Sequence, residues 1–201
     1  MSRRVFISFR YSDGHRYKEY LDKLFSNTDT VINHSESEDR TNLSEDTIKN
    51  YLYNKLKNTS VTIVILTPEA IEHKKIITNF GYKIDDWMYD EIRYSLDDRE
   101  NNRCNGLIAV YTPETEKLII SRSDDSDLIT IKKFNNLVSE NMFNIKDYYK
   151  HNSKTNIYDA NWDHYCSLIS WNEFIKNYDK YIECAENKRD NKEQYKINKR
   201  M

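Results

Sequence analysis

Glycine and cysteine are both scarce in this sequence of 201 residues, which contains 3 of each. Phosphate-binding loops of the GxGxxG and Walker types need several glycines at close spacing, so this sequence excludes both. Cys104, Cys166 and Cys184 lie far apart in the chain. An odd number of cysteines without paired spacing argues against a disulfide framework and against a zinc knuckle, so we expect reduced thiols.

Long apolar runs and an excess of charge of one sign are absent as well. No run approaches the ~20 apolar residues of a membrane-spanning helix, and the N-terminal segment soon turns polar. Lysine and arginine number 31 against 33 aspartates and glutamates, which predicts neither a nucleic-acid partner nor a membrane-surface patch. The 5 histidines have no ligand spacing, so we expect no metal site. These features predict a cytoplasmic protein.

Two adjacent segments give the strongest structural signal. The unbroken apolar run VTIVIL (61–66) is typical of a strand buried on both faces of a parallel sheet. The segment DDWMYDEIRYSL (85–96) predicts a helix, because its apolar residues recur every four positions and either leading aspartate can cap its first turn. Trp87 and Glu91 are four apart, so this helix places them on one face, beside the apolar stripe.

Strand and helix patterns alternate through most of the chain. Further apolar strand patterns occupy residues 3–9, 30–33, 106–112 and 165–171. This alternation predicts an α/β fold with an open, mainly parallel sheet, helices on both faces and a flavodoxin-like strand order. Ligands bind such sheets beyond the carboxyl ends of the strands, where the strand order reverses. Here that point falls between the first and third strands.

We expect a single domain over residues 1–185. Residues 115–164 follow no clear period and form an irregular insertion before the last strand. Within it, residues 117–123 and 127–133 have strand-like patterns and can pair as a hairpin. Residues 134–150 have a pattern typical of one broken helix. The tail, residues 186–201, is almost wholly charged or polar, so we expect it to fray.

The order of three motifs resembles a TIR-like domain, and specifically the TIR-like proteins of the bacterial Thoeris antiphage system. The opening RRVFISFRYSD is similar to the first strand and loop of that family. KNTSVTIVILTPE and the following Trp-x-x-x-Glu helix are similar to its third strand and next helix. The resemblance covers roughly residues 3–112, and SLISWNEFIKNYDKYIECA is similar to the C-terminal strand and helix.

The resemblance implies an enzyme, an NAD+ nucleosidase or ADP-ribosyl cyclase, with Glu91 as its catalytic residue and NAD+ as substrate rather than cofactor. It further implies a cyclic ADP-ribose-type product that a partner effector reads in antiphage defence, and self-association with other TIR-like domains. One carboxylate suits this chemistry, because breaking the ribose–nicotinamide bond develops positive charge at the ribose and the leaving group is already cationic.

We expect six further residues near the substrate, because they lie at the crevice between the first and third strands. We expect Arg10 to meet phosphate, and Phe9 or Tyr11 to meet a base or the nicotinamide ring. The other three have structural alternatives: Asp13 can cap the next helix, Ser8 can be a plain strand residue, and Trp87 can be part of the core.

Two other functions remain open on the sequence alone. One is a TIR assembly module without catalysis, which would use the same fold only to bind other TIR domains. The other is a receiver-like phosphoacceptor, which shares the sheet but needs an aspartate at the end of the third strand, where this chain has Thr67. We rank the phosphoacceptor last.

Overall fold

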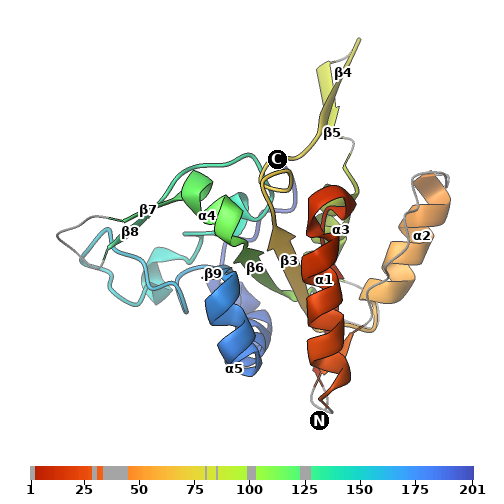
Figure 1. Cartoon of the computed structure of the whole chain (residues 1–201). Helices are drawn as coiled ribbons and strands as arrows, with labels where there is room; N and C mark the ends of the chain where they lie inside the picture. The colour runs from red at the N-terminus through yellow and green to blue at the C-terminus, as the bar shows by residue number, and fades with distance from the viewer. Residues whose placement is uncertain are drawn as a thin grey trace.

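A five-stranded sheet lies at the centre of the computed structural model, which describes residues 3–28, 31–33, 45–79, 81–84, 86–98, 103–122 and 128–201. Its neighbouring strands are all parallel and follow the order β2-β1-β3-β6-β9 (Figure 1). The strands are β1 (Arg3–Ser8), β2 (Val31–Asn33), β3 (Val61–Leu66), β6 (Gly106–Tyr111) and β9 (Cys166–Ser170). This is the flavodoxin-like order, so the predicted fold class is confirmed.

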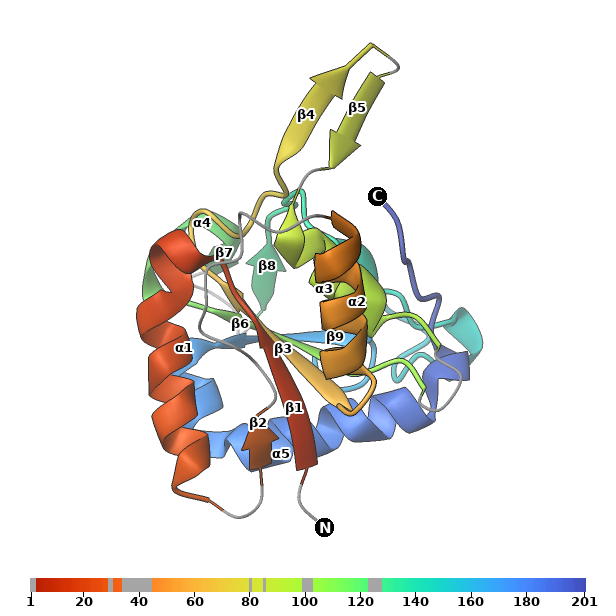
Figure 2. The same ribbon diagram turned by 90° about the vertical axis from the view of Figure 1, so that its right-hand side faces the viewer.

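Helices cover both faces of the sheet (Figure 2). One face carries α1 (Tyr11–Ser26) and α5 (Trp171–Asp190), and the other carries α2 (Glu45–Leu56) and α3 (Trp87–Ser95). Strand β1 shows how the sequence produces these layers, because successive side chains of a strand point to opposite faces. Val5 and Ile7 belong to the core cluster with α1 and α5, whereas Phe6 packs with apolar residues of α2.

The two central strands, β3 and β6, are buried at every residue. Their continuous apolar sequences match the burial of both faces of a parallel sheet. Gly106 begins β6 at a close approach to α5, because a Cβ placed there would lie 2.2 Å from the carbonyl oxygen of Ala185. Glycine at this position therefore lets α5 pack directly on the start of the strand.

The connection from β3 to α3 contains a hairpin that the sequence patterns did not predict. Strands β4 (Lys75–Thr78) and β5 (Gly81–Ile84) pair antiparallel and project from the edge of the sheet where β1 and β3 end (Figure 2). Ile77, on β4, is 90% exposed. The chain returns from this hairpin directly to the start of α3.

The insertion before the last strand is only partly as predicted. The expected hairpin is present as β7 (Ile120–Arg122) and β8 (Ile129–Ile131), which pair antiparallel. Its first predicted strand is shorter than expected, because α4 (Pro113–Ile119) occupies the preceding residues. Thr112 caps α4 and Pro113 begins it, a combination that favours a helix start over a continued strand.

The predicted broken helix over residues 134–150 is wrong. The segment contains two single turns of 3-10 helix, η1 (Ser139–Asn141) and η2 (Asp147–Tyr149), joined by irregular chain. Asparagine side chains explain the irregular path, because they bond to backbone groups that a helix would otherwise use. The side-chain amide of Asn141 donates to the carbonyl of Leu137, and the side-chain oxygen of Asn136 accepts from the amide of Val138.

The tail is ordered by contacts with the insertion, where the sequence composition predicts fraying. Helix α5 continues to Asp190, and a 3-10 turn, η3 (Lys192–Gln194), follows it. Tyr195 is 6% exposed, and its hydroxyl donates to the carbonyl of Trp162 at 2.7 Å. The amide of Asn198 donates to the side chain of Asn141. These contacts hold the last residues against the insertion.

The sequence HSESEDRTNL (34–43) predicts an acidic loop, and Ser44 after it is a candidate cap for the next helix. Both predictions lie outside the described residues. Within the described part of the chain, no helix has the length and apolar character needed to cross a membrane. Cys104, Cys166 and Cys184 are all free thiols.

Candidate active site

The candidate site lies where the chain leaves β1 and β3 toward opposite faces of the sheet. After β1 the chain enters α1 on one face, and after β3 it passes through the hairpin to α3 on the other. Strand order reverses between these two strands, as the sheet order β2-β1-β3 shows. An open parallel sheet has its ligand-binding crevice at such a point, beyond the carboxyl ends of the strands.

Helix α3 brings Glu91 to this point. Met88 and Ile92 are buried against the sheet, and Asp86 caps the helix by accepting a hydrogen bond from the Met88 amide. The buried stripe fixes the rotation of the helix, so Glu91 faces the last residue of β1. There the hydroxyl of Ser8 donates to Glu91 Oε2 at 2.6 Å.

Burial gives the Glu91 carboxyl an unusual proton affinity. The residue keeps partial exposure, but loss of solvent around its carboxyl group raises the pKa to about 8. The hydrogen bond from Ser8 acts in the opposite direction, because it stabilises the charged form. The negative charges of Asp86 and Asp90 add to the increase. The structure therefore holds a carboxyl group whose charge changes near neutral pH at the end of β1.

Asp86 has the opposite electrostatic character. Its carboxylate is buried, which by itself raises the pKa, but its partners outweigh burial and lower the pKa to about 2. His73 Nδ1 lies 3.1 Å from Oδ2, Arg10 Nη2 lies 2.6 Å from the same oxygen, and the Lys74 amide donates to it at 3.0 Å. Asp86 is therefore a fixed anion that ties β1 and the loop after β3 to the start of α3.

His73 extends this network to the insertion. The backbone amide of Leu137 donates to His73 Nε2 at 3.0 Å, so Nε2 carries no proton and Nδ1 is the nitrogen that donates to Asp86. The His73 amide donates to the carbonyl of Asn135 at 2.8 Å. Residues 135–137 thus fasten the loop that leads into α3.

The residues expected near substrate fall into separate groups. Ser8 and Glu91 touch directly, and Arg10 reaches α3 through Asp86. Arg10 also donates to the carbonyl of Glu72 and is 9% exposed, so its Nη2 holds the fold together instead of being free for a phosphate. Trp87, in the first turn of α3, is 36% exposed and is therefore not a core residue.

Phe9, Tyr11 and Asp13 point elsewhere. Phe9 packs with the core cluster of α1 and α5, on the face of the sheet opposite α3. Tyr11 is 47% exposed and its ring lies 4.9 Å from that of His15. Asp13 does not cap α1: it accepts from the Thr67 hydroxyl at 2.6 Å and from the Glu69 amide at 3.0 Å, which joins α1 to the loop after β3.

Sequence reasoning missed His73 as a member of this site. The absence of ligand spacing among the histidines argued only against a metal, and gave no information about a carboxylate partner. A buried ion-pair network forms between positions 10, 73 and 86, and no local pattern marks such distant partners. The one available signal was Asp86 itself, which was identified as a helix cap.

A comparison with protein families finds a match that covers Glu91 and Ser8. Residues 6–117 match the model of the family described as "Thoeris protein ThsB, TIR-like domain". The matched range contains Ser8, Arg10, His73, Asp86 and Glu91, whereas residues 135–137, which bond to His73, lie beyond it. The greater part of the insertion and the tail lie beyond it.

Proposed function

Because this chain belongs to the antiphage-defence family of the Thoeris protein ThsB, TIR-like domain, we propose that it cleaves the bond between nicotinamide and ribose in NAD+. Glu91 is the catalytic carboxylate in this proposal. The observation that carries it is the hydrogen bond from Ser8 to Glu91 at the point where the strand order reverses. It places an acid with a raised pKa where a nucleotide is expected to bind.

The reaction needs few catalytic groups besides the Glu91 carboxylate. The electron pair of the glycosidic bond leaves with nicotinamide, which departs as a neutral molecule, so no general acid is required. Positive charge develops on the ribose carbon, and an ionised Glu91 stabilises it or holds the ribose hydroxyls. Attack by water yields ADP-ribose and a proton. Attack by a second nucleophile of the same molecule yields a cyclic product and a proton.

The positive charge on the nicotinamide ring of the substrate explains how Glu91 becomes ionised in the proposed reaction. With a pKa of about 8, the carboxyl is largely protonated at neutral pH in the free protein. The nicotinamide ring of NAD+ is cationic, and an adjacent positive charge favours the ionised form of an acid. Binding of NAD+ therefore favours the ionised, active form of Glu91. Once neutral nicotinamide has formed, this positive charge is gone and the carboxylate is no longer favoured.

We propose a cyclic ADP-ribose-type product that activates a partner effector. Cyclisation requires that water be kept from the reacting carbon while the second nucleophile is held close. The contacts of residues 135–137 with His73 fix the loop beside the site, which supports the exclusion of water near Glu91.

The decisive experiment is the Glu91→Gln variant, assayed for nicotinamide release by chromatography and for nucleotide products by mass spectrometry. We expect turnover to fall by ~10²–10⁴-fold with the fold retained. Glu183→Gln is the matched control, because Glu183 is also a helix glutamate but pairs with Arg3 at the opposite end of β1. Unchanged nicotinamide release in Glu91→Gln would remove the assignment.

One observation favours a second function, assembly with other TIR-like domains. The β4–β5 hairpin projects from the body and exposes Ile77, although an isolated two-stranded hairpin is only marginally stable in water. If assembly is the function, Ile77→Lys will abolish oligomers in light scattering while Glu91→Gln preserves both oligomers and defence. Loss of defence in Glu91→Gln with oligomers intact would identify catalysis as the function.

A further inference from the structure

A groove between the insertion and the tail lies outside the site described above. It consists of two adjoining cavities of about 610 and 620 Å³, formed by segments 131–135, 139–147 and 196–201, and we call it the insertion groove. Lys133, Glu140 and Asn198 line both cavities. Each volume lies within the range of small-molecule sites. Most of the groove falls outside the residues that match the family.

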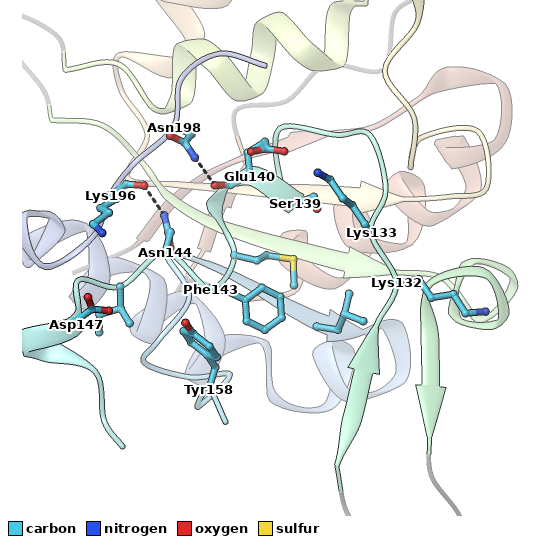
Figure 3. Close-up of a pocket in the computed structure, with 13 residues that line it drawn as sticks. Lys132, Lys133, Ser139, Glu140, Phe143, Asn144, Asp147, Tyr158, Lys196 and Asn198 are labelled. Atoms are coloured by element: carbon cyan, nitrogen blue, oxygen red, sulfur yellow. Dashed lines mark hydrogen bonds between the residues drawn. The ribbon is translucent and has the colours of Figure 1, made fainter. Parts of the chain in front are cut away.

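The walls of the groove are built by direct hydrogen bonds between insertion and tail (Figure 3). The side-chain amide of Asn144 donates to the carbonyl of Lys196 at 3.1 Å, and that of Asn198 donates to the carbonyl of Glu140 at 2.8 Å. Buried Asn141 accepts from the Asn198 amide on the same seam. The cavity is therefore held open by a defined framework.

The groove carries an excess of positive charge. Five basic and three acidic side chains line its two cavities, in a chain whose net charge is -2. Lys132, Lys133 and Lys196 belong to the first cavity, and Lys75, Lys133 and Arg200 to the second. A concave surface that concentrates one sign of charge attracts ligands of the opposite sign.

An aromatic wall stands beside these cations. Phe143 has a φ of 52°, which makes it the only residue other than glycine with positive φ in the described part of the chain. Its ring remains 45% exposed while packing edge-on against Tyr158, with centroids 5.2 Å apart. Both rings line the first cavity, and Figure 3 shows Lys133 above them. The conformation is disfavoured for a bulky residue, so the insertion holds this ring at the cavity against a local backbone preference.

We propose that the insertion groove binds a nucleotide. The base stacks on the exposed Phe143 ring, the Tyr158 ring, which stands at 85° to it, meets the edge of the base, and the phosphate meets Lys133. Rings with nearby ammonium groups provide both interactions that a nucleotide offers, stacking and charge neutralisation. A simple anion would use only the lysines, and an uncharged aromatic molecule only the rings.

A nucleotide that extends past Lys133 into the second cavity also touches the loop that supports Glu91. Glu72 and Lys75 line the second cavity, and the amide of Asn135 donates to Glu72 Oε1 at 3.3 Å. His73 lies between Glu72 and Lys75 in the chain, and its side chain bonds to the Asp86 carboxylate. Nucleotide binding therefore restrains residues 72–75, an effect that hydrogen exchange detects whether or not the protein has the proposed activity.

The test uses the full chain carrying Glu91→Gln, in which the proposed turnover is strongly lowered, so that binding is measured separately from the proposed function. Isothermal titration with AMP, ADP-ribose and inorganic phosphate distinguishes a mononucleotide from a reaction product and both from a simple anion. We expect at least one nucleotide to bind tenfold or more tightly than phosphate, with slower exchange at residues 72–75. Binding of phosphate equal to that of both nucleotides, or no nucleotide binding, overturns the proposal.

Further variants locate the binding. In the Glu91→Gln chain, Lys133→Glu and Phe143→Ala should each weaken nucleotide binding about tenfold or more. Lys154→Glu is the matched control, because Lys154 is an exposed lysine of the insertion outside the groove lining. Trp87→Ala reports on the Glu91 crevice and should leave this binding unchanged. Binding that Trp87→Ala abolishes, and that Lys133→Glu and Phe143→Ala leave intact, would place the nucleotide at the other site.

Discussion

The Arg10 guanidinium and the Asp86 carboxylate form a buried ion pair, with Nη2 and Oδ2 2.6 Å apart. The two residues are 76 positions apart in the chain. Arg10 directly precedes α1, and Asp86 directly precedes α3. This pair therefore joins the starts of two helices that lie on opposite faces of the sheet, and it sets the position from which Glu91 reaches Ser8.

Arg10→Ala should destabilise the fold. It leaves the charge of Asp86 buried without its ionic partner, which we expect to cost about 3–5 kcal/mol in the free energy of unfolding. Urea denaturation followed by circular dichroism measures this loss. Arg16→Ala is the comparison, because its ion pair with Glu114 is exposed and should contribute roughly 0–1 kcal/mol. Equal losses in the two variants would contradict a structural role for Arg10.

The proposed reaction should accelerate with rising pH. Ionised Glu91 is the active form, and its pKa is raised to about 8 in the free protein. We therefore expect kcat/KM for NAD+ to increase from pH 6 to 9 with an apparent pKa near that value, since kcat/KM reports the free enzyme. The pKa seen in kcat should be lower, because bound NAD+ favours the carboxylate. A profile independent of pH in this range would exclude Glu91 ionisation as the controlling step.

Ser8→Ala should shift that profile toward alkaline pH. The Ser8 hydroxyl donates to the Glu91 carboxylate and so lowers its pKa, and removing this donor raises it further. Activity at pH 7 should then fall and partly recover at higher pH, whereas a purely structural loss would not recover. Ser12→Ala is a suitable control, because its hydroxyl binds exposed Glu69 instead. Full pH profiles of both variants make the comparison.

The contribution of Glu91 to the free energy of unfolding should decrease as pH rises. The folded state raises its pKa from 4.5 to about 8, so the folded protein binds the proton more tightly than the unfolded chain. This contribution to stability is fully present below pH 4.5, declines as pH rises, and is lost above about 8. At pH 9 we expect Glu91→Gln to be more stable than the native chain by on the order of 1–3 kcal/mol. Denaturation at pH 5 and pH 9 tests this, and a difference that does not grow with pH would contradict it.

The sheet and α3 were predictable because their signals are local. The apolar run of β3 and the four-residue spacing of Met88, Ile92 and Leu96 each specify burial within one element. Alternation of strands and helices restricts the strand order to a few doubly wound arrangements, of which the flavodoxin-like one is found. The position of Glu91 near the end of β1, where it contacts Ser8, follows from that order and from the spacing in α3.

The partners of Arg10, Asp13 and the tail were not predictable in the same way. Each depends on contacts between distant segments, and a single sequence carries no record of such pairing. Arg10 has the chemistry to bind phosphate, but Asp86 is its actual partner. A charged tail predicts fraying on average, yet one aromatic residue, Tyr195, anchors it against Tyr165.

Tyr195 is therefore expected to contribute to stability although it lies in a tail of polar composition. Its ring packs edge-on against Tyr165 with centroids 5.4 Å apart, and its hydroxyl donates to the carbonyl of Trp162. Tyr195→Ala removes a buried aromatic side chain and should lower the free energy of unfolding by about 3–5 kcal/mol. Tyr148→Ala provides the reference, because Tyr148 is 90% exposed and its removal should change stability by less than about 0.5 kcal/mol. A frayed tail would make the two variants indistinguishable. Docking of the tail also predicts that Tyr195→Ala opens the insertion groove, so nucleotide binding there should weaken in parallel with the loss of stability.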